Sequence, residues 1–137
     1  MTKNIILLIE DNEQNRYLVT FLLEQHGYAV VAAPDGPTSL ALANTFVPHL
    51  ILLDIQLPLM DGYAVARALR TIESLNYTPI VAVTSYAMVG DREKALAAGC
   101  NGYIEKPINP DTFVAEIARF GIPADTSKDQ HAPSADR

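Results

Sequence analysis

The sequence predicts an α/β fold in which five helices cover a doubly wound sheet of five parallel strands. Two observations support this prediction. Short apolar runs alternate with longer amphipathic stretches along the 137 residues. The apolar runs are continuous, which is typical of strands that are buried on both faces of a sheet. Alternation of strand and helix at this spacing favours parallel strands that are joined by right-handed crossovers.

The first two strand–helix pairs are marked by apolar spacing and by turn residues. A continuous apolar run predicts a strand at 5–9, and helical spacing predicts a helix over 13–26 that ends at a glycine. The second strand is predicted at 29–32. A turn follows, and Pro37, which suits the first position of a helix, opens a helix that runs to about Phe46.

The other three pairs follow the same pattern. Their strands are predicted at 50–53, 80–84 and 103–104, and the helices after them include 65–72, 92–98 and 113–117. The last helix ends at Gly121. The tail over 123–137 is polar and has no periodicity, so we expect it to be disordered. The prediction is therefore one domain over residues 1–122.

The chain is acidic, with 16 Asp and Glu against 10 Lys and Arg and a net charge of −6. A negative chain repels phosphate backbones and anionic lipids, so we expect no direct binding to nucleic acid or membranes. Its apolar runs are too short to cross a bilayer and no signal-peptide pattern is present, which predicts a cytoplasmic protein. Cys100 is the single cysteine, so no internal disulfide can form, and we expect it to be half-buried in a turn.

Three acidic side chains follow two of the predicted strands. Glu10 and Asp11 come after the first strand, and Asp54 comes after the third. In the flavodoxin-like strand order 2-1-3-4-5 the first and third strands are neighbours, so these carboxylates converge at the carboxyl edge of the sheet. Like charges in one cleft are costly, unless a cation lies among them. Oxygen ligands of this kind suit Mg²⁺.

Two further polar residues fall at the same edge. Thr84 ends the fourth strand, and Lys106 follows the fifth. A lysine supplies a positive charge that pairs with phosphoryl oxygens, and a threonine hydroxyl can donate to another such oxygen. A cis peptide bond at Lys106–Pro107 would direct the lysine into the cleft, although the base rate of X–Pro bonds favours trans.

Four segments carry a resemblance to a known family: Ile9–Asn12, Asp54–Gly62, Val83–Ser85 and Tyr103–Pro107. Over about residues 4–121 the chain resembles the receiver domains of bacterial two-component response regulators. The stretch Asp11–Asn15 and the lack of an attached effector are similar to single-domain regulators of the DivK kind. Receivers at the ends of hybrid kinases have similar sequences.

The resemblance implies a phosphorylation site. Asp54 would be the phosphoacceptor, supplied by a histidine kinase or a histidine phosphotransfer protein. Asp11 would be the main Mg²⁺ ligand, Glu10 would contribute mostly through water, and the backbone carbonyl of Gln56 would complete the metal site. The chain would then be a phosphoacceptor signalling protein, which assists its own phosphorylation and dephosphorylation, rather than an enzyme.

The resemblance also implies a switch. Lys106 would hold the phosphoryl oxygens, and Thr84 would be the switch hydroxyl. Tyr103 would be the aromatic residue that turns inward on activation. The face formed by the fourth helix, the fifth strand and the fifth helix would then change its binding to a downstream protein.

Three other functions are considered for this fold. An interaction module that is not phosphorylated would lack an acid or the lysine, and none is missing. A phosphatase of the haloacid-dehalogenase type needs a second Asp two positions after the nucleophile, where this chain has Gln56. A flavodoxin-like FMN carrier needs a phosphate loop after the first strand, where Glu10 and Asp11 would repel a phosphate.

The predicted first helix has more apolar positions than one face needs: Tyr17, Leu18, Val19, Phe21 and Leu22. We expect these side chains to pack in the core. The alternative is that part of this face docks the helix bundle of a kinase or phosphotransfer protein, as it does in similar receivers.

Overall fold

The structure, a computed structural model, describes residues 3–85 and 90–121. The tail predicted from residue 123 lies outside these residues. The described chain forms a parallel sheet in the order β2-β1-β3-β4-β5, which confirms the predicted fold class and strand order. The strands are β1 (Ile5–Ile9), β2 (Ala29–Ala33), β3 (Leu50–Asp54), β4 (Ile80–Thr84) and β5 (Gly102–Glu105).

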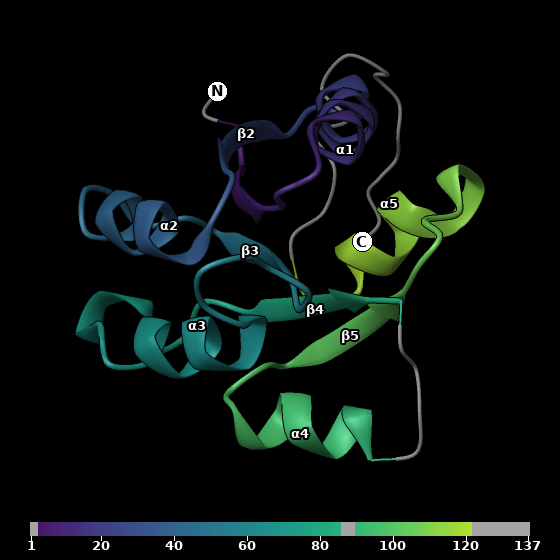
Figure 1. The fold of residues 1–137 in the computed structure, drawn as a ribbon. Coiled ribbons are helices and arrows are strands. Elements are labelled where there is room, and N and C mark those ends of the chain that lie inside the picture. Colours follow the sequence, from purple (N-terminus) through teal and green to yellow (C-terminus); the bar gives the residue numbers. More distant parts are fainter. Residues whose placement is uncertain (1–2, 86–89, 122–137) are drawn as a thin grey trace.

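The helices cover both faces of the sheet (Figure 1). On one face lie α1 (Glu13–Gln25) and α5 (Pro110–Ala118). On the other face lie α2 (Gly36–Ala43), α3 (Gly62–Leu69) and α4 (Asp91–Ala97). A 3₁₀ turn, η1 (Glu73–Leu75), precedes β4. None of the helices in the described ranges has the length and apolarity needed to cross a membrane.

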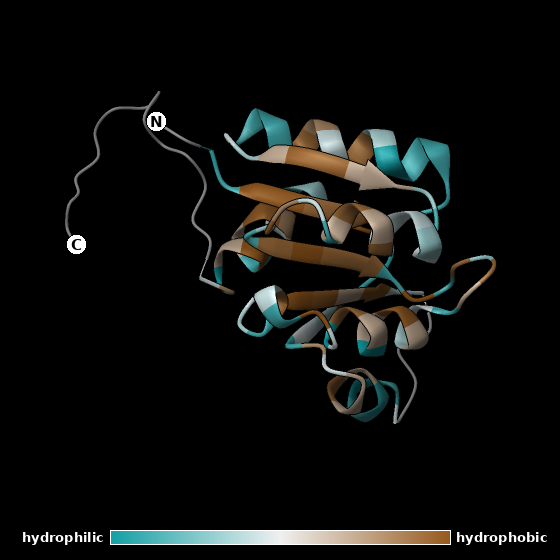
Figure 2. Ribbon diagram, turned by 90° about the vertical axis from the view of Figure 1, so that its left-hand side faces the viewer, coloured by the Kyte–Doolittle hydropathy of each residue, from teal (hydrophilic) through white to brown (hydrophobic). Residues whose placement is uncertain are grey.

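The strands divide the core into two layers. In β1, Ile6 and Leu8 point toward α1 and α5, whereas Leu7 and Ile9 point toward α2 and α3. Every residue of β3 and β4 is buried, because helices cover both sides of the sheet. Figure 2 shows the result as strands that are hydrophobic along their length, inside helices of mixed character.

Side-chain caps account for where several helices begin. Asn12 accepts a hydrogen bond from the backbone N–H of Asn15 at 2.8 Å, at the start of α1. Asp35, Asp61 and Asn109 cap α2, α3 and α5 in the same way. Each such cap stabilises a helix end by about 1 kcal/mol. The caps of α1 and α3 lie in the loops that follow β1 and β3, and therefore help to fix the carboxyl edge of the sheet.

Three predicted helix ends are wrong. The last helix ends at Ala118 rather than Gly121, because the N–H groups of Phe120 and Gly121 donate to carbonyl oxygens three residues back, as in a 3₁₀ turn. The second helix ends at Ala43 rather than Phe46, because the side chains of Asn44 and Thr45 donate to carbonyl oxygens of the last turn at 2.9 and 2.7 Å. The third helix ends at Leu69 rather than at residue 72. Its cap residue Arg70 donates to the carbonyl oxygen of Leu75, the last residue of η1, at 2.7 Å, which holds the chain in the 3₁₀ turn.

The apolar residues of α1 are not all in the core, contrary to our expectation. Val19 and Leu23 are buried, and their i, i+4 spacing sets the face that meets the sheet. Tyr17 is 75% exposed, Phe21 is 49% exposed, and Leu18 is also exposed. These three side chains therefore form an apolar surface, which we call the α1 surface.

The environment of Cys100 also differs from the prediction. The side chain is buried among the residues of the α2–α3–α4 layer, not half-buried. Burial raises the pKa of the thiol to about 11, so the group is protonated and unreactive at neutral pH.

Candidate functional site

The three predicted carboxylates lie together at the carboxyl edge of the sheet. Ile9 of β1 pairs with Leu53 of β3, so Glu10 and Asp54 occupy neighbouring positions at the strand ends. Carboxylate oxygens of Glu10, Asp11 and Asp54 lie within 4.8 Å of one another. Glu10 is 4% exposed and Asp54 is 3% exposed, whereas Asp11 is open to solvent. Two residues of the cluster are therefore buried, and the third is accessible to solvent.

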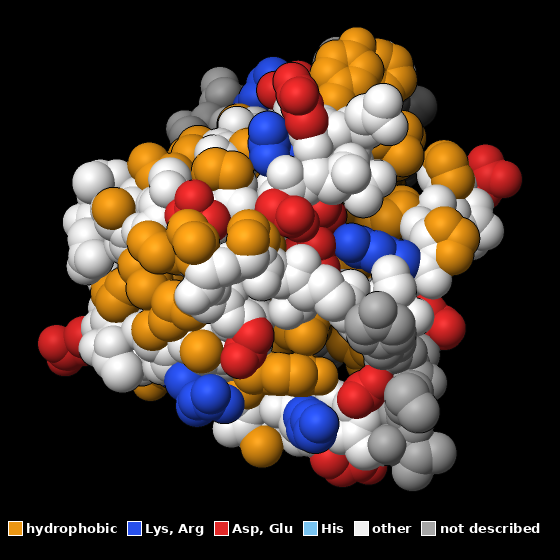
Figure 3. Space-filling model, viewed as in Figure 1, with side chains coloured by type: hydrophobic (Ala, Val, Ile, Leu, Met, Phe, Trp, Pro, Cys, Tyr) orange, Lys and Arg blue, Asp and Glu red, His pale blue; other side chains and the backbone are white. Residues whose placement is uncertain are grey.

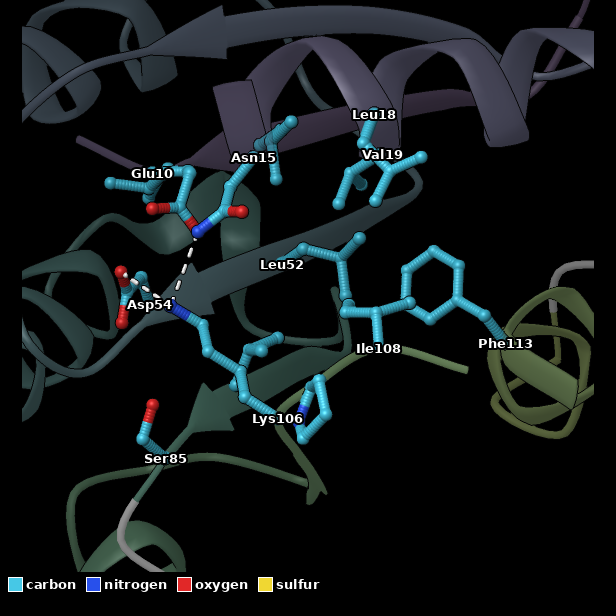
Figure 4. Close-up of a pocket in the computed structure, with 14 residues that line it drawn as sticks. Glu10, Asn15, Leu18, Val19, Leu52, Asp54, Ser85, Lys106, Ile108 and Phe113 are labelled. Atoms are coloured by element: carbon cyan, nitrogen blue, oxygen red, sulfur yellow. Dashed lines mark hydrogen bonds and ion pairs between the residues drawn. The ribbon is translucent and has the colours of Figure 1, made fainter. Parts of the chain in front are cut away.

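Lys106 reaches this cluster from the end of β5. Its backbone N–H donates to the carbonyl oxygen of Thr84 at 2.8 Å, which fixes the residue beside β4. Its Nζ lies 3.1 Å from Asp54 Oδ2 and 3.4 Å from Glu10 Oε1. Figure 4 shows the ammonium between the two carboxylates. The Lys106–Pro107 peptide bond is cis, so the expectation of a trans bond from base rates is wrong.

The electrostatics of the cluster follow from this geometry. Burial raises the pKa of Glu10, and the negative charge of Asp54 raises it further. The hydrogen bond from the backbone N–H of Asn12 and the positive charge of Lys106 lower this pKa, but by less. Burial alone would lower the pKa of Lys106, but its hydrogen bond to Asp54 and the charges of Asp54 and Glu10 outweigh that effect and raise it. One lysine thus faces two buried carboxylates, so its single positive charge does not balance the negative charges of both.

Thr84 and Gln56 complete the polar edge. Thr84 is buried at the end of β4, and its Oγ1 accepts a hydrogen bond from Gln56 Nε2 at 2.9 Å. The backbone N–H of Gln56 donates to Asp54 Oδ1 at 3.0 Å. The sequence analysis assigned the backbone carbonyl of Gln56 to the metal site and predicted no contact between its side chain and Thr84. Its side-chain contact was missed because no sequence pattern fixes where a loop glutamine points.

Tyr103 stands apart from the cluster. It is half-buried on β5 and packs against the α2–α3–α4 layer of the core. Its neighbour across the sheet is Ala82 of β4, two positions before Thr84. The structure therefore places Tyr103 on the strand next to Thr84 but not in the carboxylate cluster itself.

A tight loop holds Asp54 in place. The backbone N–H of Gly62 donates to the carbonyl oxygen of Ile55 at 2.9 Å. A Cβ atom at Gly62 would lie 2.5 Å from Ile55 Cα and 2.8 Å from the carbonyl oxygen of Asp54. Leu59, at the tip of the loop, has a positive φ of 69°. Only a residue without a side chain allows α3 to begin this close to β3.

A cavity of about 440 Å³ opens beside the carboxylates. It runs between α1 and the segment that leads into α5, and the buried acids and Lys106 stand at one end (Figure 4). Its apolar wall includes Leu18, Val19, Ile108 and Phe113. Leu18 also belongs to the α1 surface, so the cavity and that surface are continuous. In Figure 3 apolar side chains gather at the top of this face, and acidic side chains lie nearer its middle.

The donor set fits a divalent cation. Carboxylate oxygens are the ligands that Mg²⁺ prefers, and three of them lie close enough to share one ion. Burial and then the negative charge of Asp54 raise the pKa of Glu10, and a bound cation would offset the second of these effects. The exposed side of the cluster at Asp11 leaves room for the water molecules that Mg²⁺ usually keeps.

Comparisons with known proteins agree with this geometry. Residues 6–118 match the family model of the response regulator receiver domain. The polar-differentiation response regulator DivK of Brucella ovis is 41% identical over 120 residues, which cover 88% of this chain and 97% of that protein. The curated relatives therefore match over nearly their full length.

Solved structures show the same architecture. The chemotaxis protein CheY4 of Vibrio cholerae superposes with a TM-score of 0.84 at 28% identity, covering 87% of this chain and 99% of that one. The receiver domain of the sensor histidine kinase PA1611 of Pseudomonas aeruginosa has a TM-score of 0.80 at 35% identity, covering 87% and 98%. That structure holds a magnesium ion in its active-site cleft.

Proposed function

The chain belongs to the receiver domains of response regulators, and on this premise we propose that Asp54 accepts a phosphoryl group in a two-component phosphorelay. The observation that carries the proposal is the pairing of one ammonium with two buried carboxylates at 3.1 and 3.4 Å. A phosphoryl group attached to Asp54 converts that carboxylate into an acyl phosphate, a mixed anhydride, and places new anionic oxygens beside Lys106. The ammonium of Lys106 is already positioned to pair with these phosphoryl oxygens.

The metal site in this proposal uses the residues of the cluster. Asp11 and Asp54 would bind Mg²⁺ directly, Glu10 would act mostly through water, and the backbone carbonyl of Gln56 would complete the set. A bound Mg²⁺ would supply the positive charge that stabilises anionic oxygens during phosphoryl transfer. The magnesium ion in the cleft of the similar PA1611 receiver supports this assignment.

The chemical step is a nucleophilic substitution at phosphorus. A carboxylate oxygen of Asp54 attacks the phosphorus of a phosphohistidine on the donor protein, the P–N bond breaks, and the imidazole leaves and takes up a proton. Lys106 Nζ, which is 3.1 Å from Asp54 Oδ2, is positioned to pair with oxygens of the transferred group. Positioning and charge neutralisation account for most of the acceleration in such transfers.

The signalling step follows from the new charge on Asp54. The buried hydroxyl of Thr84 would donate to a phosphoryl oxygen, and Tyr103 would turn inward on the adjacent strand. The face of α4, β5 and α5 would then change its affinity for a downstream protein. Because each chain takes up one phosphoryl group and carries it as a signal, the protein acts as a phosphoacceptor rather than an enzyme. We also propose that it acts in the cytoplasm.

The α1 surface is proposed as the docking site for the phosphodonor. Tyr17, Leu18 and Phe21 are exposed apolar side chains on the helix that follows the carboxylate cluster. The adjoining cavity ends at Asp54, so an apolar side chain of a donor helix could enter it while the phosphohistidine meets the acceptor. Continuity between surface, cavity and acceptor favours this helix over other exposed positions.

The proposal is tested by intact-protein mass after incubation with acetyl phosphate, with and without Mg²⁺. The wild type should gain one phosphoryl group only when Mg²⁺ is present, and Asp54→Asn should gain none. Asp61→Asn, which keeps a capping side chain at α3, should react like the wild type. If the wild type stays unmodified while a known receiver reacts in parallel, the chain is instead an interaction module that is not phosphorylated.

A further inference from the structure

The side chain of Gln56 connects the acceptor loop to the end of β4. Its Nε2 donates to Thr84 Oγ1 at 2.9 Å, and its Oε1 accepts from the backbone N–H of Ser85 at 3.4 Å. The backbone N–H of the same residue donates to Asp54 Oδ1 at 3.0 Å. One residue therefore contacts both the proposed acceptor and the proposed switch hydroxyl.

We propose that Gln56 is a positioning residue that holds Thr84 and Ser85 in the unphosphorylated arrangement, and that activation requires this side chain to release Thr84. The inference rests on the proposed function, because it concerns the hydroxyl that would move toward the phosphoryl group. It assigns to Gln56 a role that the proposed function does not include, which is to oppose the movement of Thr84 toward the phosphoryl group. The polar contacts of the side chain span residues that are 28 and 29 positions away in the sequence.

The chemistry of the amide suits this role. A primary amide offers a donor and an acceptor on one planar group, and here each is used on a different residue of the β4 end. A methionine of similar length keeps neither bond, so Gln56→Met removes the contact while preserving most of the side-chain volume. Gln56 is only partly buried in its loop, and the substitution therefore leaves the hydrophobic core unchanged.

The size of the effect follows from the energetics of hydrogen bonds. A neutral hydrogen bond inside a protein contributes enough to shift a two-state equilibrium by about twofold to tenfold. Thr84 is 3% exposed, so water does not readily replace the amide when the bond breaks. Removing the hydrogen bond between Gln56 and Thr84 should therefore raise the affinity of the protein for a phosphoryl mimic by about twofold to tenfold.

The experiment is a titration with beryllium fluoride and Mg²⁺, followed by the NMR amide signals of Thr84 and Ser85. The wild type should show two sets of signals or a progressive shift. Gln56→Met should reach the activated signals at a mimic concentration about twofold to tenfold lower. Its Ser85 signal should also lie nearer the activated position before any mimic is added. Gln25→Met, the same change on the exposed side of α1, should match the wild type.

A double-mutant cycle separates positioning from a general structural effect. In a Thr84→Val background the hydroxyl is absent, so Gln56→Met should change the mimic affinity little, and the two substitutions should be non-additive. Gln56→Ala serves as the second variant if Gln56→Met unfolds. The inference is overturned if the wild type responds to the mimic but Gln56→Met has wild-type affinity. It is also overturned if the gain persists in the Thr84→Val background. A wild type whose Thr84 and Ser85 signals ignore saturating mimic instead refutes the proposed switch itself.

Discussion

The ammonium of Lys106 lies 3.1 Å from the carboxylate of Asp54 and 3.4 Å from that of Glu10. Each of these carboxylates is almost fully buried, so one cation must serve two anions in a place where water contributes little screening. Burial raises the pKa of Glu10 first and the negative charge of Asp54 raises it further, and the three carboxylates with one lysine fit a bound Mg²⁺. Two of the predictions below follow from this arrangement of charges.

Replacing Glu10 by Gln should stabilise the metal-free protein at neutral pH. The pKa of Glu10 is raised in the folded state, first by burial and then by Asp54, so the folded protein holds its proton more tightly than the unfolded chain. Stability is therefore lost as the pH rises from the unfolded pKa, near 4.5, through the folded pKa. Glu10→Gln removes this loss. Urea unfolding in EDTA should show the variant to be the more stable at pH 7, with the difference shrinking toward pH 4.

The control for this prediction is Glu24→Gln, which makes the same change on the exposed side of α1. If both variants change stability equally across the pH range, the effect comes from overall charge and not from the buried cluster.

Magnesium should raise the melting temperature, and Asp11 should be required for this effect. A ligand at 100 times its Kd stabilises a folded protein by about 2.7 kcal/mol, which amounts to several degrees for a domain of this size. Asp11 is exposed, so Asp11→Asn should leave the metal-free melting temperature nearly unchanged and remove the Mg²⁺-dependent rise. Asp111→Asn, at an exposed position in the first turn of α5, should keep the rise. Equal Mg²⁺-dependent shifts in wild type and Asp11→Asn would contradict the assignment of this ligand.

The parallel sheet could be predicted from the apolar pattern, and the carboxyl-edge cluster could be predicted once the flavodoxin-like strand order was adopted for that sheet. Continuous apolar runs identify buried parallel strands, and neighbouring strands bring Glu10, Asp11 and Asp54 to one edge whatever their side chains do. Lys106 was predictable for the same reason, since it follows the end of β5.

Features that depend on local geometry could not be predicted. The end of α2 is decided by side-chain hydrogen bonds from Asn44 and Thr45, which compete with a helix of good apolar spacing. The outward direction of Phe21 depends on which apolar face of α1 packs against the sheet, and the sequence of this helix has two apolar faces that could do so. The contact between Gln56 and Thr84 joins the loop after β3 to the end of β4, and the two residues are 28 positions apart in the sequence.

Gly62 and Gly90 should respond differently to the same substitution. At Gly62 an added Cβ would meet the backbone of Ile55 at 2.5 Å, and backbone atoms cannot move aside, so Gly62→Ala should cost about 2–3 kcal/mol. At Gly90 no atom of the described residues lies within 4 Å of the added Cβ, and the expected cost comes from its left-handed φ of 96°, about 1 kcal/mol. Chemical unfolding measures both. Equal losses would indicate that α3 does not pack against the acceptor loop as described.

Changing the α1 surface should slow transfer from a donor protein but not from a small molecule. Phe21→Ser removes an apolar side chain that is 49% exposed and packs little in the core, so stability should change by less than about 1 kcal/mol. Phosphotransfer from a histidine-phosphorylated donor that reacts with the wild type should fall at least about tenfold, as for an interface residue that contributes more than 1.4 kcal/mol. Rapid-mixing assays with the donor and with acetyl phosphate distinguish the two routes.

The matched control for the α1 surface is Tyr77→Ser. Tyr77 is 96% exposed and precedes β4, at the opposite edge of the sheet from Asp54. This variant should receive the phosphoryl group at the wild-type rate from both donors. A loss of transfer from acetyl phosphate in Phe21→Ser would show that the substitution damages the acceptor site instead of a docking surface.

The central claim is that Asp54 is the phosphoacceptor, and the position of the acyl phosphate tests it most directly. Borohydride reduces an acyl phosphate to an alcohol, so a phosphorylated aspartate becomes homoserine and can be located by peptide mass spectrometry. After treatment with acetyl phosphate and Mg²⁺, the account predicts homoserine at position 54 and at no other acidic position. Reduction at Asp11 or Glu10, or a phosphorylated protein with an unreduced Asp54, would contradict it.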